Sequence, residues 1–580
     1  MENLIYSEIL QNNSALKDSI KGPVYKISVL SNVVVHSIKE ILEYSLRIRQ
    51  INPLVELGNY DNIVQDSLKC KDSHLVIVFF DMLNIVDVFF EDLSEEMYNS
   101  LKSKICTEID TVLENLKDHP SVIFNTFSSH CFVSSYSQQS LIEKFVGQLN
   151  VYLEEKKGIN VILLNIDKIF LQTGIRQAID FRMYNSSKAP YTLLFFKKYT
   201  MAIEPIFLKN TGKSKKALIF DCDNTLWKGI VGEDGIDKLD MSRLSHSGRF
   251  FYKIQEIAVY LSKKGIIIGL CSKNNEFDVI EVLKNHSDMI LKEEHIAVKR
   301  INWEDKAKNL ISIAAELNIG LDSIVFVDDS SFEISLIQKQ IPEIVSLQVP
   351  SALYEYPDFL LQNIYRYFSL KANAEDARKT EIYKQQSERE KEKQNYKTLE
   401  EYLSSLEIVL TISEGDIKQL ERIAQLTQKT NQFNLTTKRY TETEILHIMN
   451  SDQEHVFSVF VKDKFGDNGL TAISILKTDR QNQKICNIDT FLMSCRIIGR
   501  NIEFVFMDYL VQWIASHNFA SITSEYIPTA KNRQVQDFYE SNGFILIENK
   551  EGHKNYRLEV SVYKPKNISY ITTFISVIKR

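Results

Sequence analysis

The stretch ALIFDCDNT, residues 217–225, decides the fold of the middle of this 580-residue chain. Four apolar residues read as a buried strand, and a polar run rich in aspartate follows at once. The same pattern returns in IIIGLCS (266–272) and in SIVFVDD (323–329). Amphipathic, helix-like segments lie between these strands, near 247–264, 276–286 and 304–317. Strands that alternate with helices predict an α/β unit with a parallel sheet.

Reactive side chains follow each of these strands. Asp221 and Asp223 follow the first, Ser272 ends the second, and Asp328 and Asp329 end the third. Ligands bind outside the carboxyl ends of strands in open parallel sheets, so we expect these groups to converge. Side chains alternate along an extended strand, so Asp221 and Asp223 should point into one pocket.

Several carboxylates in one pocket would repel one another, whereas a hard cation such as Mg²⁺ takes oxygen ligands and cancels their charge. The sequence therefore predicts a magnesium site formed by Asp221, Asp223, Asp328 and Asp329. Lys306, in INWEDK (301–306), would stabilise a phosphoryl group under attack, and Ser272 would donate a hydrogen bond to its oxygens. A single Asp after a strand is usually a turn or helix-cap residue, so the ordered set carries the inference.

This ordered set resembles the four motifs of the haloacid dehalogenase superfamily. The matching residues are Asp221, Asp223 and Thr225, then Ser272, then Lys306, then Asp328 and Asp329. The resemblance implies that Asp221 attacks phosphorus to form an aspartyl-phosphate, and that Asp223 protonates the leaving oxygen and then activates water. It implies Mg²⁺ held by Asp221, the carbonyl of Asp223 and Asp328, with Asp329 assisting. About twenty residues, 227–246, precede the next helix, so we expect no large cap and closure by another domain or a partner.

The longer strings FDCDNTLWKGIVGEDG, LCSKNNEFDV, RINWEDKAKNL and IVFVDD extend these four motifs. They narrow the resemblance to the FkbH-like subgroup, which is associated with loading glyceryl units onto acyl carrier proteins in polyketide biosynthesis. The resemblance implies a Mg²⁺-dependent glyceryl transferase and phosphatase acting on a phosphorylated three-carbon substrate, 1,3-bisphosphoglycerate. One alternative is a phosphatase on another metabolite with a separate acyltransferase activity. Another is a carrier-protein-binding scaffold with a vestigial site.

The C-terminal part is similar to acetyltransferases of the GNAT type through KFGDNGL, FLMSCRIIGR, YIPTAKN and FYESNGF. The resemblance implies an α+β domain in which Arg496, Gly499 and Arg500 match a turn that offers backbone N–H groups to the pyrophosphate of coenzyme A. Asn501 stands where Gly or Ala is usual. The phosphopantetheine arm of a carrier protein is therefore an alternative ligand, and a fold kept for packing or docking is another.

Two cysteines compete as a carrier of an acyl group, because glyceryl transfer from an acyl phosphate could pass through an enzyme thioester. Cys222 lies inside the first motif, but strand alternation turns it away from the carboxylates and favours a buried structural role. Cys495 precedes the presumed start of a helix, where positive potential lowers a thiol pKa. Its neighbours Met493 and Ile497 also suit a core strand.

The N-terminal part alternates strands and helices and resembles the SGNH-hydrolase fold, with Ser31 and Asn32 after its first strand. DFRMYNSSKAPYT (180–192) lacks the Asp-x-x-His pair that would activate a serine, so we expect this domain to be catalytically silent. The run RKTEIYKQQSEREKEKQ (378–394) interleaves both charges as an exposed helix does. The predicted parts are an SGNH-like domain 1–205, a phosphatase-like domain 206–370, a helical linker 371–403, a GNAT-like domain 404–565 and a β-rich tail 566–580.

Composition limits the classes of partner. The net charge of -7 is mild and the basic residues are spread along the chain, which argues against nucleic acid. Seven cysteines without a Cys-x-x-Cys pair predict reduced thiols rather than a disulfide framework or a zinc site. No apolar run approaches the length of a membrane span, so we expect a cytoplasmic protein without a membrane partner.

Overall fold

The computed structural model of the chain describes residues 4–20, 22–86, 94–132, 140–369, 379–479 and 484–576. They form two compact units. Unit 1 is Met1–Phe207 with Tyr440–Glu444, and unit 2 is Leu208–Arg439 with Ile445–Arg580. No helix in the described ranges is both long enough and apolar enough to cross a bilayer.

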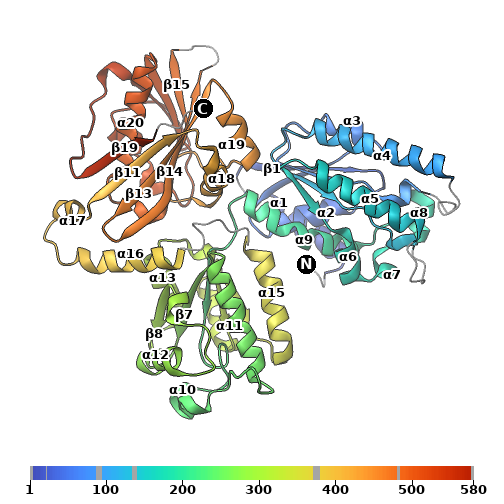
Figure 1. Cartoon of the computed structure of the whole chain (residues 1–580), viewed down its shortest axis with the longest axis horizontal. Coiled ribbons are helices and arrows are strands. Elements are labelled where there is room, and N and C mark those ends of the chain that lie inside the picture. Colours follow the sequence, from blue (N-terminus) through green and yellow to red (C-terminus); the bar gives the residue numbers. More distant parts are fainter. Residues whose placement is uncertain are drawn as a thin grey trace. The chain divides into compact units, whose positions relative to one another are not determined.

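Unit 1 contains a parallel five-stranded sheet with the strand order β2-β1-β3-β4-β5. This unit is drawn in blue to teal in Figure 1, where β1 is labelled. Its strands are β1 (Val24–Ser31), β2 (Asn52–Leu57), β3 (Leu75–Phe79), β4 (Val122–Asn125) and β5 (Val161–Leu164). Its helices are α1 (Tyr6–Lys17), α2 (Ile38–Arg47), α3 (Ile63–Ser67), α4 (Glu95–Asn115), α5 (Leu141–Lys156), α6 (Ile166–Thr173), α7 (Ile175–Ala178), α8 (Phe181–Ser187) and α9 (Leu193–Asn210). Every residue of β3 is buried, as expected for a parallel strand covered on both faces.

Unit 2 contains a second parallel sheet, which we call the central sheet, with the order β10-β9-β6-β7-β8. Its strands are β6 (Ala217–Phe220), β7 (Ile267–Ser272), β8 (Val298–Ile301), β9 (Ile324–Asp328) and β10 (Val345–Gln348). Its helices are α10 (Val231–Asp234), α11 (Gly248–Lys263), α12 (Glu276–Asn285), α13 (Lys306–Glu316), α14 (Ser331–Gln340) and α15 (Tyr356–Tyr367). The predicted parallel α/β arrangement is confirmed for this segment.

The alternation of side chains along β6 builds two cores, one on each face of the central sheet. Leu218 and Phe220 belong to a core with residues of α11 and α15, whereas Ala217 and Ile219 pack with residues of α13 and α14. Because β6 lies between β9 and β7, its carboxyl end is surrounded by the ends of its neighbours. This position is where the aspartates begin.

The remainder of unit 2 forms a nine-stranded mixed sheet, the C-terminal sheet, with the order β17-β18-β16-β15-β14-β13-β11-β19 and β12 paired to β15. Its strands are β11 (Ile408–Glu414), β12 (Phe433–Asn434), β13 (Glu454–Asp463), β14 (Gly466–Thr478), β15 (Ile485–Met493), β16 (Ser521–Tyr526), β17 (Ile545–Lys550), β18 (His553–Glu559) and β19 (Ile571–Ser576). Its helices are α18 (Leu420–Lys429), α19 (Glu442–Met449), α20 (Ile502–Ser516) and α21 (Phe538–Ser541). The β-rich tail forms β19, which pairs in parallel with β11; residues 577–580 lie outside the described part.

The parallel strands β15 and β16 pair only from Ile485 to Ile488, and the chain's own residues 433–438 lie between them beyond that point. We call these residues the insert. The Leu435 N–H donates to the Phe491 carbonyl at 3.2 Å, and the Ile527 N–H donates to the Leu435 carbonyl at 2.8 Å. The insert therefore continues the hydrogen bonding of the sheet across the gap.

The charged segment predicted as an exposed linker forms α16 (Lys379–Lys393) and α17 (Leu399–Ser405), and its residues 371–378 lie outside the described part. The predicted helix is confirmed for α16, but the helix is only partly exposed. Arg389 is 1% exposed and binds both carboxylate oxygens of Asp463, at 2.7 and 2.9 Å. A charged residue can be buried where a bidentate partner meets it, and this pairing cannot be read from the alternation of charges.

Candidate functional site

The site begins where β6 ends. Asp221 is 5% exposed, and its N–H donates to the Val327 carbonyl of β9 at 2.9 Å, which holds the two strand ends together. Lys306 is the first residue of α13, and its ammonium lies 2.9 Å from Asp221 Oδ1 and 2.7 Å from Asp328 Oδ2. The lysine therefore bridges two carboxylates from neighbouring strands, as their shared edge of the sheet predicts.

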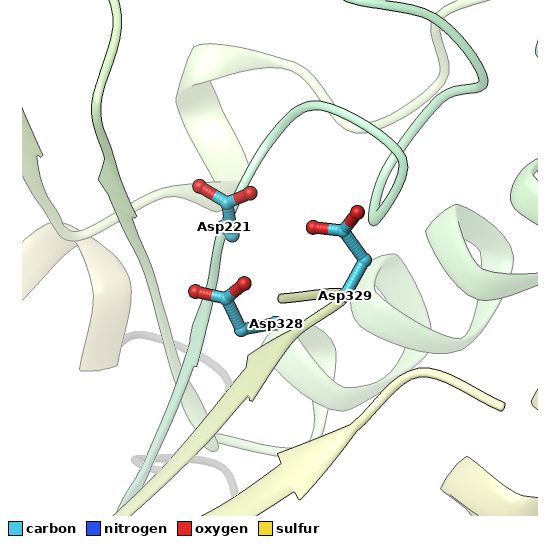
Figure 2. Close-up of side chains that lie close together, drawn as sticks. All are labelled: Asp221, Asp328 and Asp329. Atoms are coloured by element: carbon cyan, nitrogen blue, oxygen red, sulfur yellow. The ribbon is translucent and has the colours of Figure 1, made fainter. Parts of the chain in front are cut away.

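Three carboxylates gather at this point. Asp221, Asp328 and Asp329 each offer an oxygen, and these atoms lie within 4.8 Å of one another. Figure 2 shows the three side chains around one common space, with Asp328 at the tip of its strand. Asp328 Oδ1 also accepts a hydrogen bond from the Ser330 N–H at 2.9 Å, which fixes its rotamer at the start of α14.

The carboxylates outnumber the positive charge beside them. Burial raises the pKa of Asp221 above its usual range, although Lys306 opposes the shift. Burial and the neighbouring Asp221 raise the pKa of Asp328, and burial and Asp328 raise that of Asp329. Burial alone would lower the pKa of Lys306, but Asp221 and Asp328 raise it overall, so it stays protonated. One ammonium faces three acids, which leaves the pocket short of positive charge.

This deficit and the ligand chemistry fit a divalent cation. Hard cations prefer carboxylate oxygens, and a cation among Asp221, Asp328 and Asp329 would offset the burial that raises their pKa values and the repulsion that adds to it at Asp328 and Asp329. Mg²⁺ commonly uses one or two protein carboxylates together with water and phosphate oxygens, so three carboxylates are sufficient.

The Asp223 side chain is not directed into the cluster of Asp221, Asp328 and Asp329. Its Oδ1 accepts hydrogen bonds from Trp227 Nε1 at 2.8 Å and from the Val231 N–H at 3.1 Å, and its Oδ2 accepts one from Asn274 Nδ2 at 3.0 Å. The expectation that alternation would aim Asp221 and Asp223 alike depended on an extended backbone. The strand ends at Phe220, and the chain then turns. The Asp223 side chain is therefore not one of the three clustered carboxylates.

Asn274 is a part of the site that sequence reasoning missed. It is buried, and its amide nitrogen also donates to Ser272 Oγ at 3.1 Å, so it links the first and second motifs. Ser272 lies beside Asp221 and lowers the pKa of that carboxyl through a hydrogen bond. Thr225 is buried, and its Oγ1 has no hydrogen-bond partner among the described residues. The signal for Asn274 was its place two residues beyond a strand that ends in a site residue.

The structure separates the two candidate cysteines. Cys222 is fully buried in the core between the central sheet and α11, and burial raises its pKa well above the usual range. This placement agrees with the structural role that strand alternation favoured. Cys495 is half-buried in a short turn after β15, far along the chain from the aspartates. Its carbonyl accepts a hydrogen bond from Asn318 Nδ2 at 2.7 Å.

In the turn expected to bind coenzyme A, the guanidinium of Arg500 forms hydrogen bonds with other protein groups. Arg500 donates to Asp463 Oδ2 at 2.8 Å, to Gln386 Oε1 at 2.9 Å and to the Arg496 carbonyl at 2.7 Å. Gly499 and Asn501 both have positive φ, 82° and 61°. Asn tolerates this left-handed conformation better than most residues, which explains how it stands where Gly is usual. The guanidinium of Arg500 is thus held by protein groups.

The rim of the central site is apolar and uncovered within unit 2. Large exposed side chains follow several of its strands, and Trp303 and Leu244 are 76% and 94% exposed. The others are Phe277, Phe332 and Tyr354. The segment between the aspartates and α11 contains only short helices, so the expectation of no large cap insertion is confirmed there.

No protein-family model matches the chain, and no curated protein matches its sequence. A crystal structure of the N-terminal part of the protein BF1531 from Bacteroides fragilis, containing a phosphatase domain complexed with Mg, shares its fold. The two are 24% identical, the match covers 63% of this chain and 99% of that one, and the TM-score is 0.55. A putative GNAT acetyltransferase from Desulfovibrio desulfuricans is 16% identical over 20% of this chain and 78% of its own, with a TM-score of 0.18. This similarity to a GNAT acetyltransferase is too low to assign a fold family to the C-terminal sheet.

Proposed function

We propose that unit 2 is a Mg²⁺-dependent phosphatase of the haloacid dehalogenase type. The observation that carries the proposal is the buried cluster of Asp221, Asp328 and Asp329 bridged by Lys306 at the carboxyl end of β6. The magnesium in the related BF1531 structure supports it. Bound by these three carboxylates, Mg²⁺ would neutralise the charge of the substrate phosphate.

In this proposal a carboxylate oxygen of Asp221 attacks phosphorus, and the bond from phosphorus to the leaving oxygen breaks. Asp223 gives its proton to that oxygen, and then takes a proton from the water that splits the aspartyl-phosphate. Lys306 stays protonated and stabilises the phosphoryl oxygens. Asn274 and Trp227 hold Asp223 in place through the hydrogen bonds described above.

Hydrolysis of p-nitrophenyl phosphate tests the assignment. Turnover should require added Mg²⁺ and stop with EDTA, and D221N should lower it by roughly 10³-fold or more, because the nucleophile is lost. D358N, which removes an exposed carboxylate on α15, is the matched control and should stay active. A D221N protein that turns over like D358N would rule out the assignment.

For the substrate, we propose an activated phosphoglycerate, 1,3-bisphosphoglycerate, whose glyceryl group is loaded onto an acyl carrier protein. The resemblance of the motifs to the FkbH-like subgroup supports this choice. The uncovered apolar rim suits a site that a carrier protein closes during the reaction. Mass spectrometry of a holo carrier protein incubated with the enzyme and the donor would reveal a glyceryl adduct. A plain phosphatase would release phosphate from the donor and leave the carrier unmodified.

The alternative of a separate acyltransferase activity needs a thiol cofactor beside the C-terminal sheet. The edge of β15 beyond Ile488 is hydrogen-bonded to the insert, and Arg500 is bound to Asp463. A pantetheine arm would have to displace these contacts to lie along β15. We therefore favour a docking or packing role for this sheet, and calorimetric titration with coenzyme A tests it, since micromolar binding would restore the acyltransferase alternative.

A further inference from the structure

Unit 2 has a second cavity, of about 180 Å³, between the central sheet and the C-terminal sheet. At about 30 Å³ per water molecule, this volume equals about six waters, enough for a small organic molecule. Six basic residues line it: Lys215, Lys216, Arg422, Lys429, Arg496 and Lys531. None of the described residues that line it is Asp or Glu.

This cavity is distinct from the aspartate site. Lys216 precedes β6 and Asp221 follows it, so the two lie at opposite ends of one strand, roughly 16 Å apart at the usual rise of about 3.3 Å per residue. The cavity also differs from the turn that opens α20, because Gly499, Arg500 and Asn501 do not line it. The proposed phosphatase chemistry does not account for it, and the turn that resembles a coenzyme A site contributes Arg496 alone to its described lining.

Arg422 and Arg496 are buried at the cavity, Lys215, Lys216 and Lys429 are partly buried, and Lys531 is exposed. Arg496 is 6% exposed, and its Nε donates to Ser494 Oγ at 3.1 Å. Lys216 Nζ donates to the Lys429 carbonyl at 2.8 Å, a neutral group. Burial lowers the pKa of Lys216, and the positive charges of Lys531 and Arg439 add to the shift, although Cys495 and Asp322 oppose it. The carboxylate of Asp322 pairs with Lys531 from outside the lining.

The rest of the lining offers apolar contact and a hydrogen-bonding group. Ile267, Ile319 and Leu426 supply carbon surface, and the partly buried Tyr383 contributes a phenol. Gln432 also lines the cavity, and its Oε1 is buried without a hydrogen-bond partner. Because the oxygen and nitrogen of an amide are assigned from their partners, Gln432 can equally present its NH₂ group to an anion.

We infer that this cavity binds a small organic molecule that carries a phosphate or diphosphate group. A phosphate has about -1.5 to -2 charges at neutral pH and three acceptor oxygens, which matches several convergent cations better than a single carboxylate does. Buried guanidinium groups such as that of Arg496 are suited to bind such oxygens in pairs. The ligand would contact β7 of the central sheet together with α18 and the turn after β15.

Cys495 provides a reporter at the site, because this half-buried residue lines the same cavity. The experiment measures the rate of alkylation of each cysteine by N-ethylmaleimide in the full-length protein, without added metal, by peptide mass spectrometry. Sodium pyrophosphate and sodium phosphate are compared with sodium chloride at equal ionic strength. At ten times its Kd a ligand leaves about one protein in eleven free, so saturating pyrophosphate should slow the labelling of Cys495 about tenfold. Cys106, half-buried in unit 1, should be unaffected.

R496Q and K216Q should each abolish most of the protection, whereas K308Q, the same charge change on the exposed side of α13, should keep it. Lys216 is only partly buried, so K216Q provides a test if R496Q does not fold. Equal labelling of Cys495 in pyrophosphate and in chloride would overturn the inference, as would protection that persists in both cavity variants. Phosphatase activity is not part of the readout, so failure here leaves the proposed function untouched.

Discussion

Replacing Lys306 with methionine tests the electrostatic account of the carboxylate cluster. Lys306 is 4% exposed and lies 2.9 Å from Asp221 and 2.7 Å from Asp328. Removing one partner of a buried ion pair typically costs about 3–5 kcal/mol, because the remaining charge is uncompensated. Without added metal, we expect the free energy of local opening at β6 and β9 to fall by about 3 kcal/mol or more. Amide exchange there would be faster by roughly 10²-fold.

The loss of local opening free energy in K306M should depend on pH. The pKa values of Asp221 and Asp328 are already raised by burial, and they should rise further without Lys306. A carboxyl whose pKa is higher in the folded than in the unfolded state binds more protons when folded, so it destabilises the fold as pH rises through the folded pKa. The deficit of K306M should therefore be large at about pH 8 and shrink toward about pH 5.

Hydrogen exchange read by mass spectrometry on peptides that cover β6 and β9 gives the local opening free energy at both pH values. K308M is the matched control, because Lys308 is in the same helix but exposed, with its ammonium 2.9 Å from Glu304. Such surface pairs contribute about 1 kcal/mol at most. If K306M exchanged like K308M, or if its deficit were the same at both pH values, the electrostatic account would be wrong.

Three further predictions concern catalysis. D223N should bind Mg²⁺ within a few-fold of wild type by calorimetry, because the side chain of residue 223 is outside the carboxylate cluster. Its turnover should nevertheless fall by about 10²- to 10⁴-fold. Lost metal binding would show that the Asp223 carboxylate is a ligand. N274A should reduce kcat roughly 10- to 100-fold, since Asp223 and Ser272 lose a shared donor. N363A, which removes an amide that donates to the Phe359 carbonyl within α15, should not reduce it. If glyceryl transfer uses an enzyme thioester on Cys495, C495A should lose a hydroxylamine-sensitive mass increase that C222A retains. Carrier loading at the wild-type rate in both variants would favour direct attack by the carrier thiol.

The fold of the central sheet could be predicted from local sequence patterns. Its strands are short apolar runs, and the polar residues after them mark the carboxyl edge of a parallel sheet, so Asp221, Asp328 and Asp329 were expected to meet. Strand alternation also predicted that Cys222 would turn into the core. These features depend on periodicity and on the order of elements along the chain, both of which a sequence displays directly.

Other features depend on pairing between distant segments, which periodicity does not display. The direction of the Asp223 side chain is set by Asn274, 51 residues away, and by the end of the extended backbone at Phe220. Arg389 is buried because Asp463, 74 residues away, offers a bidentate partner. The place of β19 beside β11 likewise requires knowledge of which edge of the sheet is open.

The insert sets how tightly a free molecule must bind to take its place along β15. Because residues 433–438 are tethered to the sheet at both ends, they compete with any free molecule as an intramolecular ligand, at an effective concentration in the millimolar range. A diffusible molecule present at about 1 μM would need contacts roughly 10³-fold stronger, about 4 kcal/mol, to take the same place along β15. The insert therefore occupies the gap between β15 and β16, and a free molecule would replace it only by binding β15 far more tightly than the insert does.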